Sequence, residues 1–222
     1  MANILFTATG DAISPEEVSE KIESFGYNHA VHRIIQDSNK LDRKGEVFIE
    51  CASLILSNFK MTRSGPFKEY EKQKEILVNC WNEVGELLLK IHNSVIESGL
   101  SRDRFLVELS EYKLEELIAE IWLVTKRILP FTMGKTSYGL VGASKILFAV
   151  LPEIVLPIDN TQWLHVFKTV DIGDVIKRMV VDIQDWESVT GEKLNEMDDS
   201  KVLTTLPSVY NVMAMAARRN DI

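Results

Sequence analysis

The stretch PFKEYEKQKEILVNCWNEVGELLLKIHNSVIE, residues 66–97, decides the fold class of this chain. Its apolar residues recur in steps of three and four, at Leu77, Trp81, Val84, Leu88, Ile91 and Val95. That spacing places these side chains on one face of an α-helix. A helix over the whole stretch would be about 48 Å long at ~1.5 Å per residue. We therefore predict one long central helix whose apolar face belongs to the core.

Proline placement extends this prediction to the rest of the chain. Proline is tolerated in the first turn of a helix and disrupts its interior. All six prolines fall at the edges of apolar periodic stretches, at positions 15, 66, 130, 152, 157 and 207. We expect an all-α fold, with further helices near residues 15–25, 28–37, 46–60, 101–110, 114–129, 142–151, 160–169, 172–189 and 207–219. Only residues 4–9 (ILFTAT) are typical of a strand.

The length of the chain bounds its domain organisation. A chain of 222 residues suits one large domain or two closely packed lobes. Residues 130–138 hold a proline, a glycine and several small polar residues, which favours a hinge there. We expect a single helical domain over residues 1–222, with 1–130 and 131–222 as its sub-lobes if it is divided.

Composition indicates a globular protein of a reducing compartment. Hydrophobic residues make up 45% of the chain and charged residues 26%, which excludes a disordered chain. Two cysteines without a CxxC pair cannot build a disulfide framework. The N-terminal residues lack the pattern of a signal peptide. The most apolar stretch, residues 139–158, is interrupted by Lys145, Pro152 and Glu153, which is too broken for a membrane helix. We predict a cytoplasmic protein without a membrane segment.

Two motifs that could bind a ligand lack the residues that such sites need. Gly134-Lys135-Thr136 resembles the end of a phosphate-binding loop, but that loop needs a glycine where this chain has Leu129, and it follows a strand. We expect an exposed loop between helices instead. His29 and His32 have the spacing of metal ligands on a helix, but no further histidine or cysteine nearby completes a site. We therefore predict no metal site.

The two cysteines are expected to be core residues. Cys51 lies among apolar residues of a predicted helix, and Cys80 is next to Trp81. A nucleophilic cysteine needs a cation or a helix N-terminus beside it, and the sequence shows neither. No other pattern calls for a cofactor.

The most specific segment is SYGLVGASKILFAVLPEIVLPIDNTQW, residues 137–163. Gly139 and Gly142 are expected to enclose a tight turn that opens a helix carrying Lys145. That helix should stop at Pro152, and Asp159 should begin the next one.

This outline resembles the helix-hairpin-helix DNA glycosylases, in which a glycine-rich turn leads a helix and an aspartate after a proline begins the next. The resemblance implies that backbone N–H groups at Gly139 and Gly142, aided by Lys135, bind DNA phosphate. It also implies that Lys145 attacks the sugar carbon while Asp159 assists. The segment is also similar to uncharacterised helical proteins in which an S-K-x-L helix, here residues 144–147, precedes a P-x-x-D segment.

The same residues have a structural interpretation. Asp159 and Gln162 form the D-x-x-Q pattern of a capping box, so Asp159 can accept hydrogen bonds from the first N–H groups of its own helix. Lys145 can be a solvated lysine whose aliphatic stem covers the core.

Two functions follow from these interpretations. The first is a binding or structural protein that acts through its surfaces, as a homo-oligomer or with an unknown partner. The alternative is a nucleic-acid-binding protein or DNA glycosylase that uses residues 134–163. The charge of the chain gives opposite indications for these two functions. The whole chain has a formal net charge of −8. That field opposes non-specific DNA binding, whereas residues 126–178 hold seven basic and four acidic side chains.

Overall fold

The structure is a computed structural model that describes residues 3–25, 33, 45–63, 65–198 and 205–220. Within these residues the fold is all-α, as the sequence predicts. Extended structure in the described part is limited to an isolated antiparallel bridge between Phe6 and Ala12. The strand-like pattern at residues 4–9 gives no strand, because a single bridge within one short loop offers no ladder for it to join.

Helices account for most of the described residues. The α-helices are α1 Pro15–Phe25, α3 Gly45–Asn58, α4 Tyr70–Glu97, α5 Phe105–Glu108, α6 Glu111–Ile128, α7 Ser137–Phe148, α8 Ile172–Thr190 and α9 Leu206–Asn220. Short 3-10 helices lie at η2 Met61–Arg63, η3 Gly65–Phe67, η4 Leu129–Phe131 and η6 Leu194–Met197, and η5 Gln162–Phe167 is a π-helix. The helix expected at residues 101–110 shrinks to α5, and the one expected at 28–37 lies outside the described residues apart from position 33.

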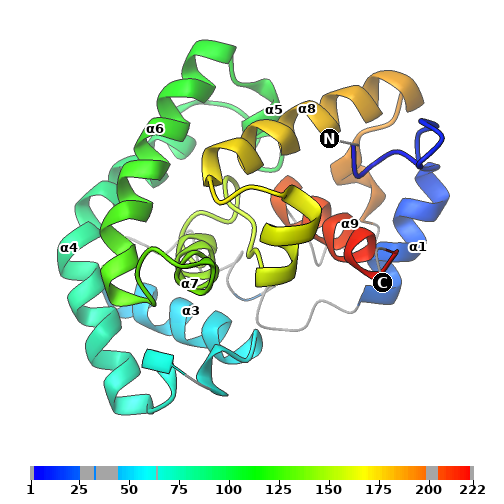
Figure 1. The fold of residues 1–222 in the computed structure, drawn as a ribbon. Coiled ribbons are helices and arrows are strands. Elements are labelled where there is room, and N and C mark those ends of the chain that lie inside the picture. Colours follow the sequence, from blue (N-terminus) through cyan, green and yellow to red (C-terminus); the bar gives the residue numbers. More distant parts are fainter. Residues whose placement is uncertain (1–2, 26–32, 34–44, 64, 199–204, 221–222) are drawn as a thin grey trace.

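The centre of the molecule is α7 together with the segment that follows it. Figure 1 shows α7 almost end-on in the middle, with α3, α4 and α6 around it. Every residue from 139 to 158 is buried. Small residues allow this close packing, since a Cβ on Gly142 would lie 3.0 Å from Thr132 Cγ2. The segment that looked too broken for a membrane helix is thus the buried middle of the core.

The long helix predicted at residues 66–97 is α4, the longest of the described helices. It begins at Tyr70 rather than Pro66, and it runs along one side of the molecule rather than through its centre (Figure 1). Most of its predicted apolar face is buried, namely Leu77, Val84, Leu88, Ile91 and Val95. This face packs against α3 and α6.

Trp81 is only partly buried, which corrects its predicted place on the core face of α4. Its ring fills the crossing between α3 and α4. A Cβ on Gly45 would lie 2.9 Å from that ring, and one on Gly85 2.8 Å. The two glycines therefore allow the helices to approach across the indole, which also contacts Phe48 at 5.0 Å between ring centroids.

Helices from the two ends of the chain pack together. α1 packs on α9 and η6, and hydrogen bonds tie the residues before α1 to α8. The Ile4 N–H donates to Asp182 Oδ2 at 3.2 Å, and Trp186 Nε1 donates to the Ile13 carbonyl at 2.7 Å. One hydrophobic core therefore runs from Ile4 to α9, and these parts form a single all-α domain. Among the described helices, none is both long and apolar enough to cross a membrane.

Candidate functional site

The predicted glycine turn does not exist, because Gly139 and Gly142 both lie inside α7. The helix begins earlier, where Thr136 is the N-cap and its Oγ1 accepts a hydrogen bond from the Gly139 N–H at 3.0 Å. A Cβ on Gly139 would lie 1.9 Å from the Gly134 carbonyl oxygen. Gly139 is therefore needed for close packing and not for a turn, and the real turn is the connector at residues 132–136.

Lys135 lies in this connector and is exposed. Gly134 beside it has a φ of 64°, a left-handed conformation that favours glycine. α6 and η4 precede the connector, so no strand leads into it. The interpretation of Gly134-Lys135-Thr136 as an exposed loop between helices is confirmed.

Lys145 is buried, which corrects the interpretation of a solvated lysine. Its relative exposure is 2%, and the side chains around it on α7 are mostly apolar. The ammonium lies 5.3 Å from the centroid of the Phe59 ring and donates to the Ile158 carbonyl at a long 3.4 Å. One weak hydrogen bond and one cation–π contact leave most of its donor capacity unused among the described residues.

Burial changes the ionisation of this lysine. Removal from water lowers the pKa of Lys145 to about 8, and the nearby charge of Asp159 opposes that shift. The two residues singled out in the sequence thus lie near enough for their charges to interact. A lysine with such a pKa is partly neutral near pH 8, which is a property of nucleophilic lysines.

Asp159 has the capping role that its sequence pattern predicts. Its Oδ1 accepts a hydrogen bond from the Gln162 N–H at 2.8 Å, and Gln162 Oε1 accepts one from the Asp159 N–H at 2.8 Å. This reciprocal pair is a complete capping box. The Gln162 amide also donates to Asn211 Oδ1 at 2.9 Å, which ties the start of η5 to α9.

A second buried charge was not foreseen from the sequence. The side chain of Glu153 is fully buried and pairs with Arg102. Burial raises the pKa of Glu153, and the Arg102 guanidinium opposes that rise. Burial also lowers the pKa of His92 to about 4, and the Arg102 charge adds to this effect. The pair joins the loop between α4 and α5 to the segment after α7, within the core.

The cysteines are confirmed as core residues, since Cys51 and Cys80 are both buried and free. Burial, with the charge of Glu83, raises the pKa of Cys80 to about 12. The Cys80 side chain is therefore a neutral thiol at physiological pH.

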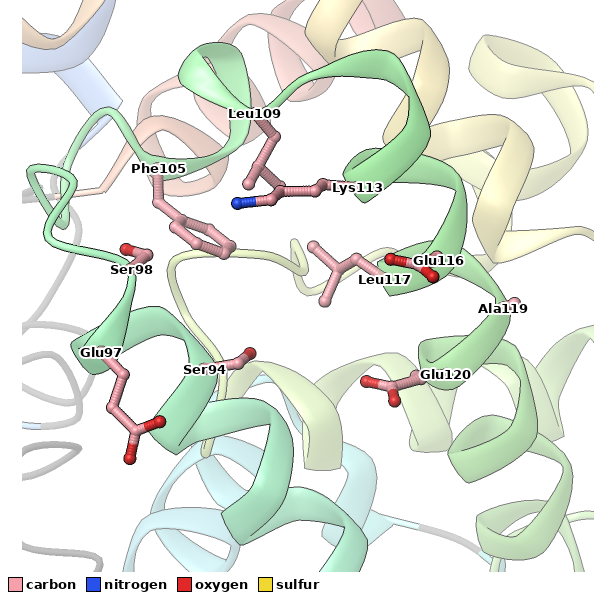
Figure 2. A pocket seen from close by; sticks show the side chains of 10 residues that line it. All are labelled: Ser94, Glu97, Ser98, Phe105, Leu109, Lys113, Glu116, Leu117, Ala119 and Glu120. Carbon is pink, nitrogen blue, oxygen red and sulfur yellow. The ribbon is translucent and has the colours of Figure 1, made fainter.

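A groove of about 590 Å³ opens between the end of α4, α5 and the first half of α6 (Figure 2). Figure 2 shows Phe105 and Leu117 pointing toward each other across its floor, with Leu109 beside them. Glu97 on α4 and Glu116 and Glu120 on α6 surround this floor, with Lys113 as the one cation among the residues that line it. The groove is therefore apolar below and acidic at its rim. Its residues come from three elements, so no single sequence motif could predict it.

A second cavity of about 560 Å³ lies between the N-terminal residues, α1, η5, α8 and α9. Its charged lining is mainly basic: Lys21, Lys168 and Arg178 outnumber Glu17. The two hollows thus differ in the sign of their charge.

The described residues hold no group of three or more histidine, cysteine, aspartate or glutamate side chains placed to bind a metal ion. His29 and His32 lie outside the described residues. Comparison of the chain with protein-family models, curated proteins and solved structures gives no match. The resemblance of residues 137–163 to helix-hairpin-helix DNA glycosylases therefore stays a prediction from the sequence.

Proposed function

We propose that this chain is a binding protein that takes a cationic, partly apolar protein segment into the groove between α4, α5 and α6. The observation that carries the proposal is the lining of the groove, where three carboxylates surround an apolar floor and Lys113 is the one cation (Figure 2). Lys90, outside the lining, pairs with Glu120, so Glu97 and Glu116 carry the negative charge that the partner would meet. An amphipathic helix or extended segment with basic residues offers the complementary surface.

The charge of the whole chain supports this partner. A formal net charge of −8 attracts cationic partners and repels anionic ones. Charge steers the encounter, while the apolar floor supplies burial at the centre of the contact. A cytoplasmic location and self-association stay predictions of the sequence.

The predicted catalytic residues also favour binding over catalysis. The ammonium of Lys145 is enclosed between Phe59 and the Ile158 carbonyl, so a substrate would reach it only after the core opens. The carboxylate of Asp159 caps its own helix. Asp159 therefore has a structural role that accounts for its presence, and Lys145 is enclosed away from any substrate.

Charge reversal in the groove tests the proposal. The probe is a helical peptide of leucine and lysine, titrated by fluorescence anisotropy. Glu97→Lys should weaken its binding by roughly fivefold or more, because an attraction becomes a repulsion. The matched control is Glu71→Lys, which makes the same charge change at an exposed position of α4 outside the groove and should leave the affinity nearly unchanged.

Equal loss of affinity in the two variants would show that the peptide responds only to overall charge. No saturable binding by the unmodified protein would also contradict the proposal. Raising the salt concentration should weaken binding without abolishing it, because the apolar part of the contact is not screened.

A second candidate function is a DNA glycosylase that uses Lys145 and Asp159, with Lys135 near the DNA. The specific observation in its favour is the pKa of Lys145, lowered to about 8 by burial. A neutral amine could form a Schiff base with the sugar carbon of an abasic site. This function requires α7 or its neighbours to move and expose the amine.

Borohydride trapping separates this candidate from the first. The protein is incubated with duplex DNA that contains an abasic site, and the reductant is added to fix any Schiff base. A glycosylase should give a covalent adduct that Lys145→Gln abolishes. Asp159→Asn should keep the cap and its stability while removing activity, because asparagine caps about as well as aspartate. The absence of adduct and of DNA binding at low salt would exclude this function.

A further inference from the structure

The cavity between the N-terminal residues, α1, η5, α8 and α9 has the volume and the lining of a small-molecule site. Its volume of about 560 Å³ falls within the range of about 300–1,000 Å³ that is usual for ligand pockets. Three parts of the chain far apart in sequence contribute to it: residues 3–13 with α1, η5 and its C-cap with α8, and α9. Such convergence is typical of a site that is largely formed before its ligand arrives.

The floor of this cavity is apolar. It is lined by Ile4, Phe6, Ile13, Val166, Met213, Ala216 and Ala217. Of these, Ile4, Val166 and Met213 are nearly buried already. An apolar ligand body would remove the remaining exposed surface of the floor from water. Ala216 and Ala217 are small, so a flat ring has room to lie against α9.

The cations of the lining differ in what already neutralises them. Lys21 pairs with Glu17 at 2.5 Å. Arg178 faces Asp182 at 3.5 Å and donates to the Val166 carbonyl at 2.9 Å, so its guanidinium is held in place. Lys168 pairs with none of the described side chains. The uncompensated positive charge of the cavity is therefore that of Lys168.

Lys168 also has an unusual backbone conformation. Its φ of 52° and ψ of 36° are left-handed, and it forms the C-cap of the π-helix η5. Glycine is the common residue at such a cap, because a Cβ is disfavoured there. The left-handed backbone would favour glycine at this position, but the residue there is a lysine with a charged side chain. Strained positions of this kind cluster at functional sites.

We propose that this cavity binds a small organic anion, with its phosphate or carboxylate group held by Lys168 and Arg178 and its apolar, ring-bearing body on the floor. Arg178 presents a fixed guanidinium, and Lys168 supplies the unpaired charge. The site is independent of the acidic groove, and its ligand has the opposite charge.

Titration calorimetry with four probes tests this proposal on the full chain. Phenyl phosphate and benzoate carry both halves of the expected ligand and distinguish a phosphate from a carboxylate. Inorganic phosphate carries the charge alone, and benzyl alcohol the ring alone. We expect phenyl phosphate or benzoate to bind saturably and more tightly than either half alone.

A lysine-to-glycine pair gives the decisive comparison. Lys168→Gly should weaken the better probe by about tenfold or more, because a charge-assisted contact is lost. The same variant should keep or raise the melting temperature, because glycine suits the left-handed backbone. Lys60→Gly is the matched control, since Lys60 is an exposed lysine with a φ of 59° that does not line the cavity. It should change stability in the same direction and leave binding unchanged.

Three results would overturn the proposal. The first is that neither phenyl phosphate nor benzoate binds saturably. The second is that inorganic phosphate binds as tightly as both, which would leave the floor without a role. The third is that Lys60→Gly weakens binding as much as Lys168→Gly, which would reduce the effect to overall charge.

Discussion

Lys145 shows how one buried ammonium makes stability depend on pH. Its pKa is about 8 in the folded chain and 10.5 in the unfolded chain. Between these two values the unfolded state binds more protons, so the free energy of unfolding rises with pH. The stabilisation is complete above pH 10.5 and is lost as the pH falls through about 8. A shift of this size corresponds to about 3 kcal/mol.

Replacing the charge should remove this dependence. Lys145→Met keeps an unbranched side chain beside Phe59, and it should stabilise the protein at pH 7 by up to about 3 kcal/mol. Its free energy of unfolding, measured by urea titration, should no longer gain the Lys145 contribution between pH 8 and 10.5. Lys135→Met, which removes an exposed lysine, is the control and should retain that contribution. An unchanged pH profile in Lys145→Met would show that the lysine is solvated.

At the level of elements, the connector and α7 depend on the absence of a side chain at one position. Gly139→Ala would place its Cβ 1.9 Å from the backbone oxygen of Gly134, which a small shift cannot relieve. Gly142→Ala would meet only the Thr132 side chain, at 3.0 Å. Both substitutions gain about 1 kcal/mol of helix propensity. Gly139→Ala should nevertheless be clearly destabilising, by roughly 1–3 kcal/mol or more, and Gly142→Ala much less so. Thermal unfolding measures both, and equal melting temperatures would contradict the packing argument.

The elements that could be predicted are those whose signal is local. The period of three and four residues identified α4, and the D-x-x-Q pattern identified the cap at Asp159. The turn at Gly139 could not be distinguished from close packing, because glycine serves both purposes in a sequence. Here the packing partner, Gly134, decided between them.

The parts of the candidate sites that depend on distant residues could not be predicted. Lys145 is buried because Phe59, 86 positions earlier, lies beside it. Glu153 finds Arg102 across 51 positions. The acidic groove and the basic cavity are each assembled from separate elements, so neither leaves a pattern of fixed spacing.

At the level of the whole molecule, Asp182 joins the two ends of the fold. Its Oδ2 accepts hydrogen bonds from the Ile4 N–H and, at 2.7 Å, from the Tyr210 hydroxyl, and it faces Arg178. Asp182→Ala would leave these buried donors without their acceptor, so it should cost about 3–5 kcal/mol. Hydrogen exchange at the Ile4 amide should accelerate more than exchange in α4. Asp185→Ala, at an exposed position of the same helix, is the control and should change neither. Protection at Ile4 that survives Asp182→Ala would contradict this role.

The placement of the indoles gives the protein two built-in optical reporters. Trp81 and Trp122 lie in residues 1–130 and are partly exposed, whereas Trp163 and Trp186 lie in residues 131–222 and are fully buried. Variants that retain one pair with phenylalanine at the other two positions would emit from one half of the chain at a time. Coincident denaturation curves, corrected for the stability of each variant, would identify one cooperative unit. Separate midpoints would show that the halves on either side of residue 130 melt as distinct bodies, even though a shared core joins them.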